Sequence, residues 1–344
     1  KTEYEVVREK FENRKVTKSF ITIDVARKNK FIIDWNKSKI KKPAFLGVKE
    51  IKIDDLSILR EYIDWTQFFR SWNLHGIYPD IFGYEANGKE AKILFDDANE
   101  LLDKIIKEKL LTAKGIFGIF PANSVDDDIL VYDHKLSDKV LDKFLTLRQQ
   151  SKKAEGIPNI ALSDFIAPES SRIKDYIGSF CVSTGFGSDE LCQKFEKEND
   201  DYSSIMVKAL ADRFAEAFAE FLHKEVRIKY WGYSHNEKTD NNDLIKEKYT
   251  GIRPAPGYPA CPDHLEKNTI WKLLRVEEKI GVKLTESLAM WPAASVSGYY
   301  FANTESKYFG LGKIDKDQVI DYSKRRKISF EKASKWLNPN INDI

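Results

Sequence analysis

Cysteine is scarce in this sequence: Cys181, Cys192 and Cys261 are the only three among 344 residues. Three widely spaced cysteines cannot build the disulfide framework of a small secreted domain, and an odd number favours a reducing compartment. We therefore expect a cytoplasmic protein. No uninterrupted apolar run approaches the ~20 residues that a membrane-spanning helix requires, so we expect no membrane partner.

An excess of charge of either sign is also missing. The 56 basic residues face 54 acidic ones, which leaves a formal net charge of +2. Binding to nucleic acid or to an anionic membrane is usually driven by a clear positive excess, so neither partner is expected. With 42% hydrophobic and 12% aromatic residues, the composition is that of an ordinary folded protein.

The N-terminal stretch KTEYEVVREKFENRK is charged and has the character of a helix rather than of a signal peptide. The first residue is lysine instead of methionine, which indicates an excerpt from a longer chain. We expect residues 1–20 to form a linker helix and residues 21–344 to form one domain.

Hydrophobic periodicity predicts a few long helices and clustered strands. Apolar residues recur every three or four positions over 89–111 and 203–232, which predicts two long helices. A third helix is expected over 263–281, with Asp263 as its N-cap and Gly281 as its terminator. Residues 56–65 are also helical in period, and two short helices end the chain.

The remaining segments predict a sheet. β-Branched and aromatic content predicts strands at 31–35, 43–53, 115–122, 127–133, 174–184, 294–302 and 306–314. Because these strands are mostly linked as hairpins, the fold class is α+β with a mainly antiparallel sheet.

Most signatures of enzymes are absent. The chain has no G-x-G-x-x-G, Walker loop, H-E-x-x-H or nucleophile elbow, and STGFGSD at 183–189 is interpreted as a turn that ends a strand. Cys261 and His264 form a C-x-x-H pair without a second pair at zinc-site spacing, so no metal is expected. The acidic run at 125–129 is interpreted as a solvated loop before a strand. No catalytic residue is expected.

One stretch, GIRPAPGYPACPDHLEK at 251–267, concentrates four prolines and two glycines in a loop. Proline fixes φ and glycine permits unusual backbone geometry, so the conformation of this loop is set before any ligand binds. Arg253 offers a two-pronged site for a carboxylate, Gly257 lets backbone approach a ligand, and Tyr258 offers a hydroxyl and an aromatic face. The alternative, that Arg253 pairs with a surface acid, is equally supported by the residues alone.

A second stretch, YIDWTQFFRSW at 62–72, places Asp64 among aromatic side chains. An acid in such apolar company is a helix cap or an ion-pair partner, because an unpaired buried carboxylate is costly, and capping is the commoner role. An arginine for a carboxylate and an aspartate for an ammonium would together suit the amino-acid end of a ligand. An amino acid or one of its derivatives is therefore indicated.

These motifs resemble the C-terminal activation domain of cobalamin-dependent methionine synthase. The loop RPAPGY matches the R-x-x-x-G-Y signature of that family, and IDWTQFF at 63–69 is similar to it as well. So are the longer stretches LADRFAEAFAEFLHKEVRIKYWGY, KLTESLAMWPAASVSGYYF and SKYFGLGKIDKDQVIDYSKRR. The resemblance extends from about Thr22 to Leu337.

The resemblance implies a single crescent-like domain that binds S-adenosylmethionine and presents its methyl group to cobalamin on a separate domain. When the cobalamin oxidises to cob(II)alamin, an electron from flavodoxin or an equivalent reductase combines with this methyl transfer to reactivate the enzyme. The implied partners are the cobalamin-binding domain, from which the linker helix would lead, and the reductase. The chain has no D-x-H-x-x-G cobalamin motif, so it should not make methionine alone.

The resemblance also implies residue roles. Arg253 would hold the methionyl carboxylate, Asp64 would hold the amine, and Tyr258 would line the site. Tyr308 and Phe309 fall where the family contacts the ligand.

Two acids, Glu216 and Glu247, match family acids near the site, although surface ion pairs explain them nearly as well. Asp126 and Gln67 stand where the family commonly has glycine and proline, which leaves the shapes of these two loops open.

The alternative function is a sensor or scaffold module that binds S-adenosylmethionine without methyl transfer.

Overall fold

The computed structural model describes residues 19–136 and 139–342 of the chain. The linker helix expected over residues 1–20 falls outside these ranges except for Ser19 and Phe20, and Phe20 forms an isolated antiparallel bridge with Ser151. Within the described residues, no helix is both long and apolar enough to cross a membrane.

An antiparallel sheet of six strands forms the spine of the molecule. Its two longest strands, β2 and β5, pair with each other at the centre. Strands β1, β3 and β4 lie on the β2 side, and β8 pairs with β5 on the other side. The strands are β1 (Gly47–Ile53), β2 (Thr112–Val125), β3 (Asp128–Tyr132), β4 (Val140–Leu145), β5 (Asp175–Phe186) and β8 (Ser295–Tyr300), with a separate pair of β6 (Lys283–Leu284) and β7 (Met290–Trp291).

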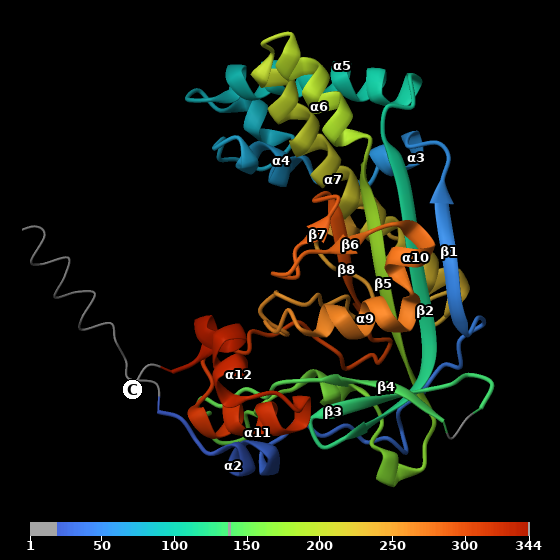
Figure 1. The fold of residues 1–344 in the computed structure, drawn as a ribbon, viewed down its shortest axis with the longest axis vertical. Coiled ribbons are helices and arrows are strands. Elements are labelled where there is room, and N and C mark those ends of the chain that lie inside the picture. The colour runs from blue at the N-terminus through green and yellow to red at the C-terminus, as the bar shows by residue number, and fades with distance from the viewer. Residues whose placement is uncertain (1–18, 137–138, 343–344) are drawn as a thin grey trace, which may run out of the picture.

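The helices gather at the two ends of the sheet and on its faces. They are α2 (Ile23–Lys28), α3 (Ser57–Arg60), α4 (Trp65–Ser71), α5 (Gly88–Lys107), α6 (Ser188–Lys197), α7 (Asp201–Glu225), α8 (Asn241–Ile245), α9 (Glu266–Leu274), α10 (Val276–Ile280), α11 (Lys316–Arg326) and α12 (Phe330–Leu337). Figure 1 shows a crescent, with α4, α5 and α6 at one horn and α2, α11 and α12 at the other. The predicted α+β class, the mainly antiparallel sheet and the crescent shape are confirmed.

Both faces of the two central strands are buried. Along β2 and β5, neighbouring side chains alternate between two cores: Phe117 and Phe180 belong to the core that contains α7, whereas Ile116 and Cys181 belong to the core that contains α9. Because neither face meets water, β5 is buried at nearly every position and its sequence shows no alternation of polar and apolar residues.

The longest helix, α7, carries acidic residues of the candidate site. It begins after Asp200, whose carboxylate accepts a hydrogen bond from the Ser203 N–H at 2.9 Å. It continues into one π-helical turn, Val226–Tyr230, and the Tyr230 carbonyl accepts from the Phe45 N–H at 2.8 Å. The long helices expected over 89–111 and 203–232 are confirmed as α5 and as α7 with this turn.

Several predicted elements are wrong. Residues 31–35 and 306–314 form no strand, and the segment 306–314 is an irregular loop. The helix expected over 56–65 is interrupted, because Asp64 adopts an extended backbone and starts α4.

The helix expected over 263–281 is two helices, because Arg275 adopts a left-handed φ of 55° between α9 and α10. Gly281 ends α10 with a φ of 78°, as expected. Asp263 is not the N-cap of α9, whose N-cap is Leu265. Asp263 is buried and pairs with Arg326 of α11 at 2.9 Å.

In the acidic run at 125–129, which was expected to be a solvated loop, Asp126 is exposed but Asp127 and Asp128 are buried in a network of ion pairs. The Asp127 carboxylate accepts hydrogen bonds from Arg27 and Arg148, both at 2.8 Å. Burial alone would raise the pKa of Asp127, but the two guanidinium groups hold it below its usual value. Asp128 pairs with Lys143 at 2.7 Å. The Arg27 pair fastens the β2–β3 hairpin to α2, and the other two pairs fasten it to β4 and to Arg148. No spacing rule predicts these contacts.

Candidate functional site

Two adjoining cavities share the side chains of Glu216, Glu247, Arg253 and Tyr258. One has a volume of about 460 Å³ and the other about 500 Å³. We call the two together the Arg253 cleft. Its lining comprises Tyr62, Asp64, Gln67, Arg213, Glu216, Glu220, Asn241, Leu244, Ile245, Glu247, Tyr249, Arg253, Pro254, Ala255, Tyr258, Pro259, Ala260, Val296, Tyr308 and Phe309. The fold thus brings together all the predicted site residues except Gly257.

The loop that carries Arg253 is fastened to the end of β8. Ile252 and Phe301 exchange two backbone hydrogen bonds of 3.0 Å, and the Pro254 carbonyl accepts from the Tyr299 N–H at 2.9 Å. Prolines supply no N–H of their own, so the loop contacts the strand through a few carbonyl and amide groups. Arg253 is therefore held against a buried strand.

Gly257 shapes this loop without lining the cleft. Its φ is +97°, and a Cβ added there would lie 2.3 Å from the His264 ring. Its N–H donates to the Cys261 carbonyl at 2.8 Å, which closes the turn that exposes Tyr258. Glycine is thus required here by backbone conformation and by lack of space, a different reason from the close approach to a ligand expected from the sequence.

The Arg253 guanidinium pairs with an acid inside the cleft. Its Nη2 lies 3.0 Å from Glu220 Oε2, and both side chains are only 14% exposed. Burial opposes the charge, but Glu220 and neighbouring groups raise the pKa of Arg253 above its usual value. The Arg253 backbone N–H donates to the Tyr308 hydroxyl at 2.9 Å. The alternative interpretation foresaw an acidic partner, but that partner lies in the wall of the cleft, not on the surface.

Behind this pair lies a second arginine that the sequence analysis missed. Arg227 donates two hydrogen bonds of 2.7 Å to Glu237, and its Nη1 lies 3.7 Å from Glu220 Oε1. Its guanidinium also stacks 4.1 Å from the centre of the Tyr249 ring. Glu220 therefore lies between two guanidinium groups. Glu216 and Glu220 lie one turn apart on α7, but this helix carries several other charged residues, so their spacing alone does not identify the site.

Asp64 caps α4 and also lines the cleft. Its Oδ1 accepts from the Thr66 N–H at 2.9 Å and from the Gln67 N–H at 3.4 Å. The capping role expected from the sequence is confirmed. Because both bonds use Oδ1, the other carboxylate oxygen remains available to a ligand.

The other predicted residues surround the opening. Tyr258 is 56% exposed, and the charge of Glu216, followed by burial, raises the pKa of Tyr258. Burial raises the pKa of Glu247, although Arg253 opposes this rise. Glu247 also has a left-handed φ of 53°, a conformation that non-glycine residues seldom adopt outside constrained positions. Tyr308 is 39% exposed, and Phe309 packs edge-on against Phe165 with 6.3 Å between ring centres.

A family model described as "Vitamin B12 dependent methionine synthase, activation domain" matches residues 55–327, a range that contains every residue of the Arg253 cleft. The chain belongs to this family. A solved structure titled "Crystal Structure of the MetH Reactivation Domain bound to AdoHcy" has 50% sequence identity to this activation domain and a TM-score of 0.92. The match covers 94% of this chain and 99% of that one. The resemblance inferred from the sequence is confirmed.

The cleft of this activation domain carries an excess of negative charge. Four carboxylates, those of Asp64, Glu216, Glu220 and Glu247, face two guanidinium groups, those of Arg213 and Arg253, so the formal charge of the lining is −2. Among residues 19–136 and 139–342, no group of three or more His, Cys, Asp and Glu side chains is placed to hold a metal. The arrangement favours a ligand with a net positive charge that also presents one carboxylate to an arginine.

Proposed function

We propose that this activation domain binds S-adenosylmethionine in the Arg253 cleft and donates its methyl group to cob(II)alamin, which reactivates cobalamin-dependent methionine synthase. The observation that carries the proposal is the pairing of a fixed arginine with an acidic cleft. S-Adenosylmethionine bears a carboxylate, an ammonium and a sulfonium, so its net charge is opposite to that of the lining. The related MetH domain was crystallised with AdoHcy, which has the same carboxylate and ammonium groups.

Each of the predicted residues that line the Arg253 cleft has a role in this proposal. One edge of the Arg253 guanidinium pairs with Glu220, and its remaining N–H donors bind the methionyl carboxylate. The unused oxygen of Asp64 accepts from the ammonium. Tyr258 lines the opening, and the carboxylates of Glu216 and Glu247 stabilise positive charge on the ligand. Tyr308 and Phe309 form the wall that fixes the other end of the ligand.

The chemistry explains why no catalytic acid or base is needed. A methyl group on a sulfonium already has a good leaving group, so S-adenosylmethionine supplies its own reactivity when it is bound. The domain must hold the methyl group in line with its acceptor, and positioning of this kind contributes ~7–11 kcal/mol toward lowering a barrier. The residues of the cleft accordingly bind and orient.

The partners follow from the same proposal. A cobalamin-binding domain of methionine synthase brings the cobalamin to the opening of the cleft, and flavodoxin or an equivalent reductase supplies the electron. We infer that the domain alone does not make methionine, because its sequence has neither the D-x-H-x-x-G cobalamin motif nor the cysteines of a homocysteine-binding zinc site.

Reconstitution tests the proposal. The chain is mixed with an isolated cobalamin-binding domain in the cob(II)alamin state, a chemical reductant and S-adenosylmethionine labelled in its methyl group. We expect label on the cobalamin only when the chain, the reductant and the donor are all present. The alternative, a sensor or scaffold module, predicts that the chain binds the donor but transfers no label.

A further inference from the structure

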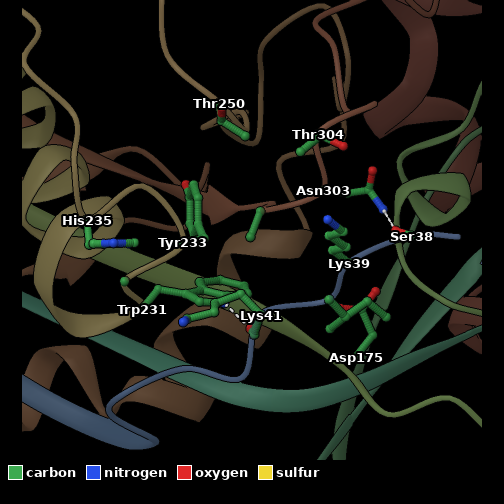
Figure 2. Close-up of a pocket in the computed structure, with 13 residues that line it drawn as sticks. Ser38, Lys39, Lys41, Asp175, Trp231, Tyr233, His235, Thr250, Asn303 and Thr304 are labelled. Carbon is green, nitrogen blue, oxygen red and sulfur yellow. Dashed lines mark hydrogen bonds between the residues drawn. The ribbon is translucent and has the colours of Figure 1, made fainter.

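A third cavity, of about 300 Å³, shares no lining residue with the Arg253 cleft (Figure 2). Four separate segments form it: residues 38–41 before β1, residues 231–235 after the π-helical turn, Thr250, and residues 302–304 after β8. Asp175, the first residue of β5, completes the lining. We call this cavity the Lys39 pocket.

The Lys39 pocket carries positive charge that the described part of the chain does not neutralise. Lys39 and Lys41 both line it, and within residues 19–136 and 139–342 neither amine has a carboxylate within 4 Å. Asp175 is the acid of the lining, but its two oxygens accept from the Ala167 N–H at 2.9 Å and from the Tyr176 N–H at 2.7 Å. Asp175 is therefore held by backbone donors, and the two lysines remain available.

Hydrogen-bond donors accompany the lysines. The hydroxyls of Thr250 and Thr304 line the pocket, and the Tyr233 hydroxyl is enclosed without a hydrogen-bond partner among the described residues. Buried polar groups in folded proteins are normally paired, so an enclosed hydroxyl without a partner beside a cavity indicates a missing acceptor. An oxyanion in the pocket would neutralise the lysines.

The pocket is held in shape by its own walls. The Trp231 Nε1–H donates to the Lys41 carbonyl at 2.9 Å, and the Asn303 side chain donates to the Ser38 hydroxyl at 3.3 Å, so residues 38–41 are fixed at two points. Trp231 and Tyr233 pack edge to face with 5.5 Å between ring centres. Figure 2 shows these rings on one side of the cavity, with Lys39, Asn303 and Thr304 on the other. Trp231 is only 1% exposed, so the partly buried Tyr233 ring supplies the aromatic surface, which suits a flat apolar group beside the charged one.

We propose that the Lys39 pocket binds a small molecule that joins a phosphate or carboxylate to a flat apolar body. The oxyanion forms a charge-assisted hydrogen bond with one of the two lysines, whose exposed side chains lie on different sides of the cavity in Figure 2, and the Tyr233 ring contacts the apolar body. The site is independent of the proposed methyl donation. It adjoins the Arg253 cleft along the chain, because Thr250 lines the pocket and the preceding Tyr249 lines the cleft.

Calorimetric titration of the whole chain with phenyl phosphate, benzoate and phenol tests the proposal. We expect saturable one-site binding of at least one of the two anions and none of phenol, and the preferred anion shows whether the natural ligand carries phosphate or carboxylate. The variant Lys39→Gln/Lys41→Gln should bind that anion about tenfold or more weakly, because it loses the charge-assisted contact whichever lysine makes it.

A matched control separates the pocket from the general charge of the surface. The variant Lys37→Gln/Lys42→Gln removes the same charge from the same segment, but neither lysine lines the pocket. Its affinity should stay within about twofold of the wild type, since exposed charges that make no contact contribute little. Excess S-adenosylhomocysteine should leave the affinity unchanged. Absence of saturable anion binding, an equal loss in both double variants, or competition by S-adenosylhomocysteine would overturn the proposal.

Discussion

Glu220 accepts a hydrogen bond from the Arg253 guanidinium at 3.0 Å and lies 3.7 Å from Arg227, so one carboxylate holds two guanidinium groups in place. Arg227 is in turn held by Glu237 through two hydrogen bonds. A side chain as long as arginine loses much conformational freedom when it binds a ligand. Glu220 removes part of that freedom before binding, and we infer that it is a positioning residue for Arg253.

Replacing Glu220 by glutamine tests this role. Glu220→Gln keeps the size of the side chain but leaves two guanidinium groups with less neutralisation. We expect a loss of about 1–3 kcal/mol in the free energy of unfolding, measured in urea, because the group is largely buried and charged. The affinity for S-adenosylmethionine should fall as well. The control Glu278→Gln, in an exposed pair with Arg275, should change stability by less than about 0.5 kcal/mol. Equal effects of the two substitutions would refute the positioning role.

Two substitutions of Asp64 separate its capping role from its proposed ligand contact. Asparagine caps a helix about as well as aspartate, so Asp64→Asn should leave the stability nearly unchanged, whereas Asp64→Ala should cost about 1 kcal/mol. If Asp64 also binds the ammonium, Asp64→Asn should weaken S-adenosylmethionine binding about tenfold or more. Calorimetric titration of Asp64→Asn with S-adenosylmethionine tests the ligand contact. An affinity equal to that of the wild type would show that Asp64 caps α4 and does not bind the ligand.

Gly257→Ala should destabilise the loop more than a matched glycine substitution elsewhere. A left-handed backbone costs an ordinary residue ~1–2 kcal/mol, and at Gly257 the new Cβ would also overlap the His264 ring. Gly312 has a φ of +74° but no atom within 4 Å of an added Cβ, so Gly312→Ala carries only the backbone cost. We expect the larger loss of stability, and a loss of ligand affinity, at Gly257. Equal losses at both positions would show that contact with His264 is unimportant.

Glu247 should make the affinity for S-adenosylmethionine decrease as the pH falls. Partial burial raises the pKa of its carboxyl above 4.5, and the charge of Glu220 adds to this rise, so the group takes up a proton at a higher pH than an unperturbed glutamate does. Protonation removes negative charge that attracts a cationic ligand. The affinity for S-adenosylmethionine should therefore decrease from pH 7 toward pH 5, by about 0.5–1 kcal/mol for this one group.

Glu247→Gln is the matched control for that dependence, because the titration of the ligand itself is the same in both proteins. We expect the variant to bind more weakly at pH 7 and to lose this part of the pH dependence. Parallel affinity profiles for the two proteins between pH 7 and pH 5 would exclude a contribution from Glu247.

Local patterns in the sequence predict much of the fold. The helices α5 and α7 follow from the apolar spacing, and the hairpin of β2 and β3 follows from two apolar runs around a polar turn. The errors occur where long-range contacts decide the local structure. Arg275 separates α9 from α10 because its φ is left-handed. An arginine at this position of the sequence does not predict that conformation. The segment 306–314 has the composition of a strand, but its Tyr308 and Phe309 face the Arg253 cleft instead of joining the sheet.

The candidate site also contains some residues that the sequence predicts and others that it does not. The motif around Arg253 and Tyr258 could be found in the sequence, and so could the acid at Asp64, because rigid loops and isolated acids are local features. Glu220 and Arg227 could not be found, because their importance comes from meeting Arg253 and Glu237 across the interior. The burial of Asp127 was missed for the same reason, since its partner Arg27 lies 100 residues away in the chain.

Calorimetric titration with S-adenosylmethionine tests the central claim most directly, with Arg253→Ala and the exposed Arg275→Ala compared with the wild type. The account predicts saturable one-site binding to the wild type and to Arg275→Ala, and binding about tenfold or more weaker to Arg253→Ala, since a charge-assisted contact contributes ~1.5–3 kcal/mol. Absence of saturable binding to the wild type, or equal affinity for the wild type and Arg253→Ala, would contradict it.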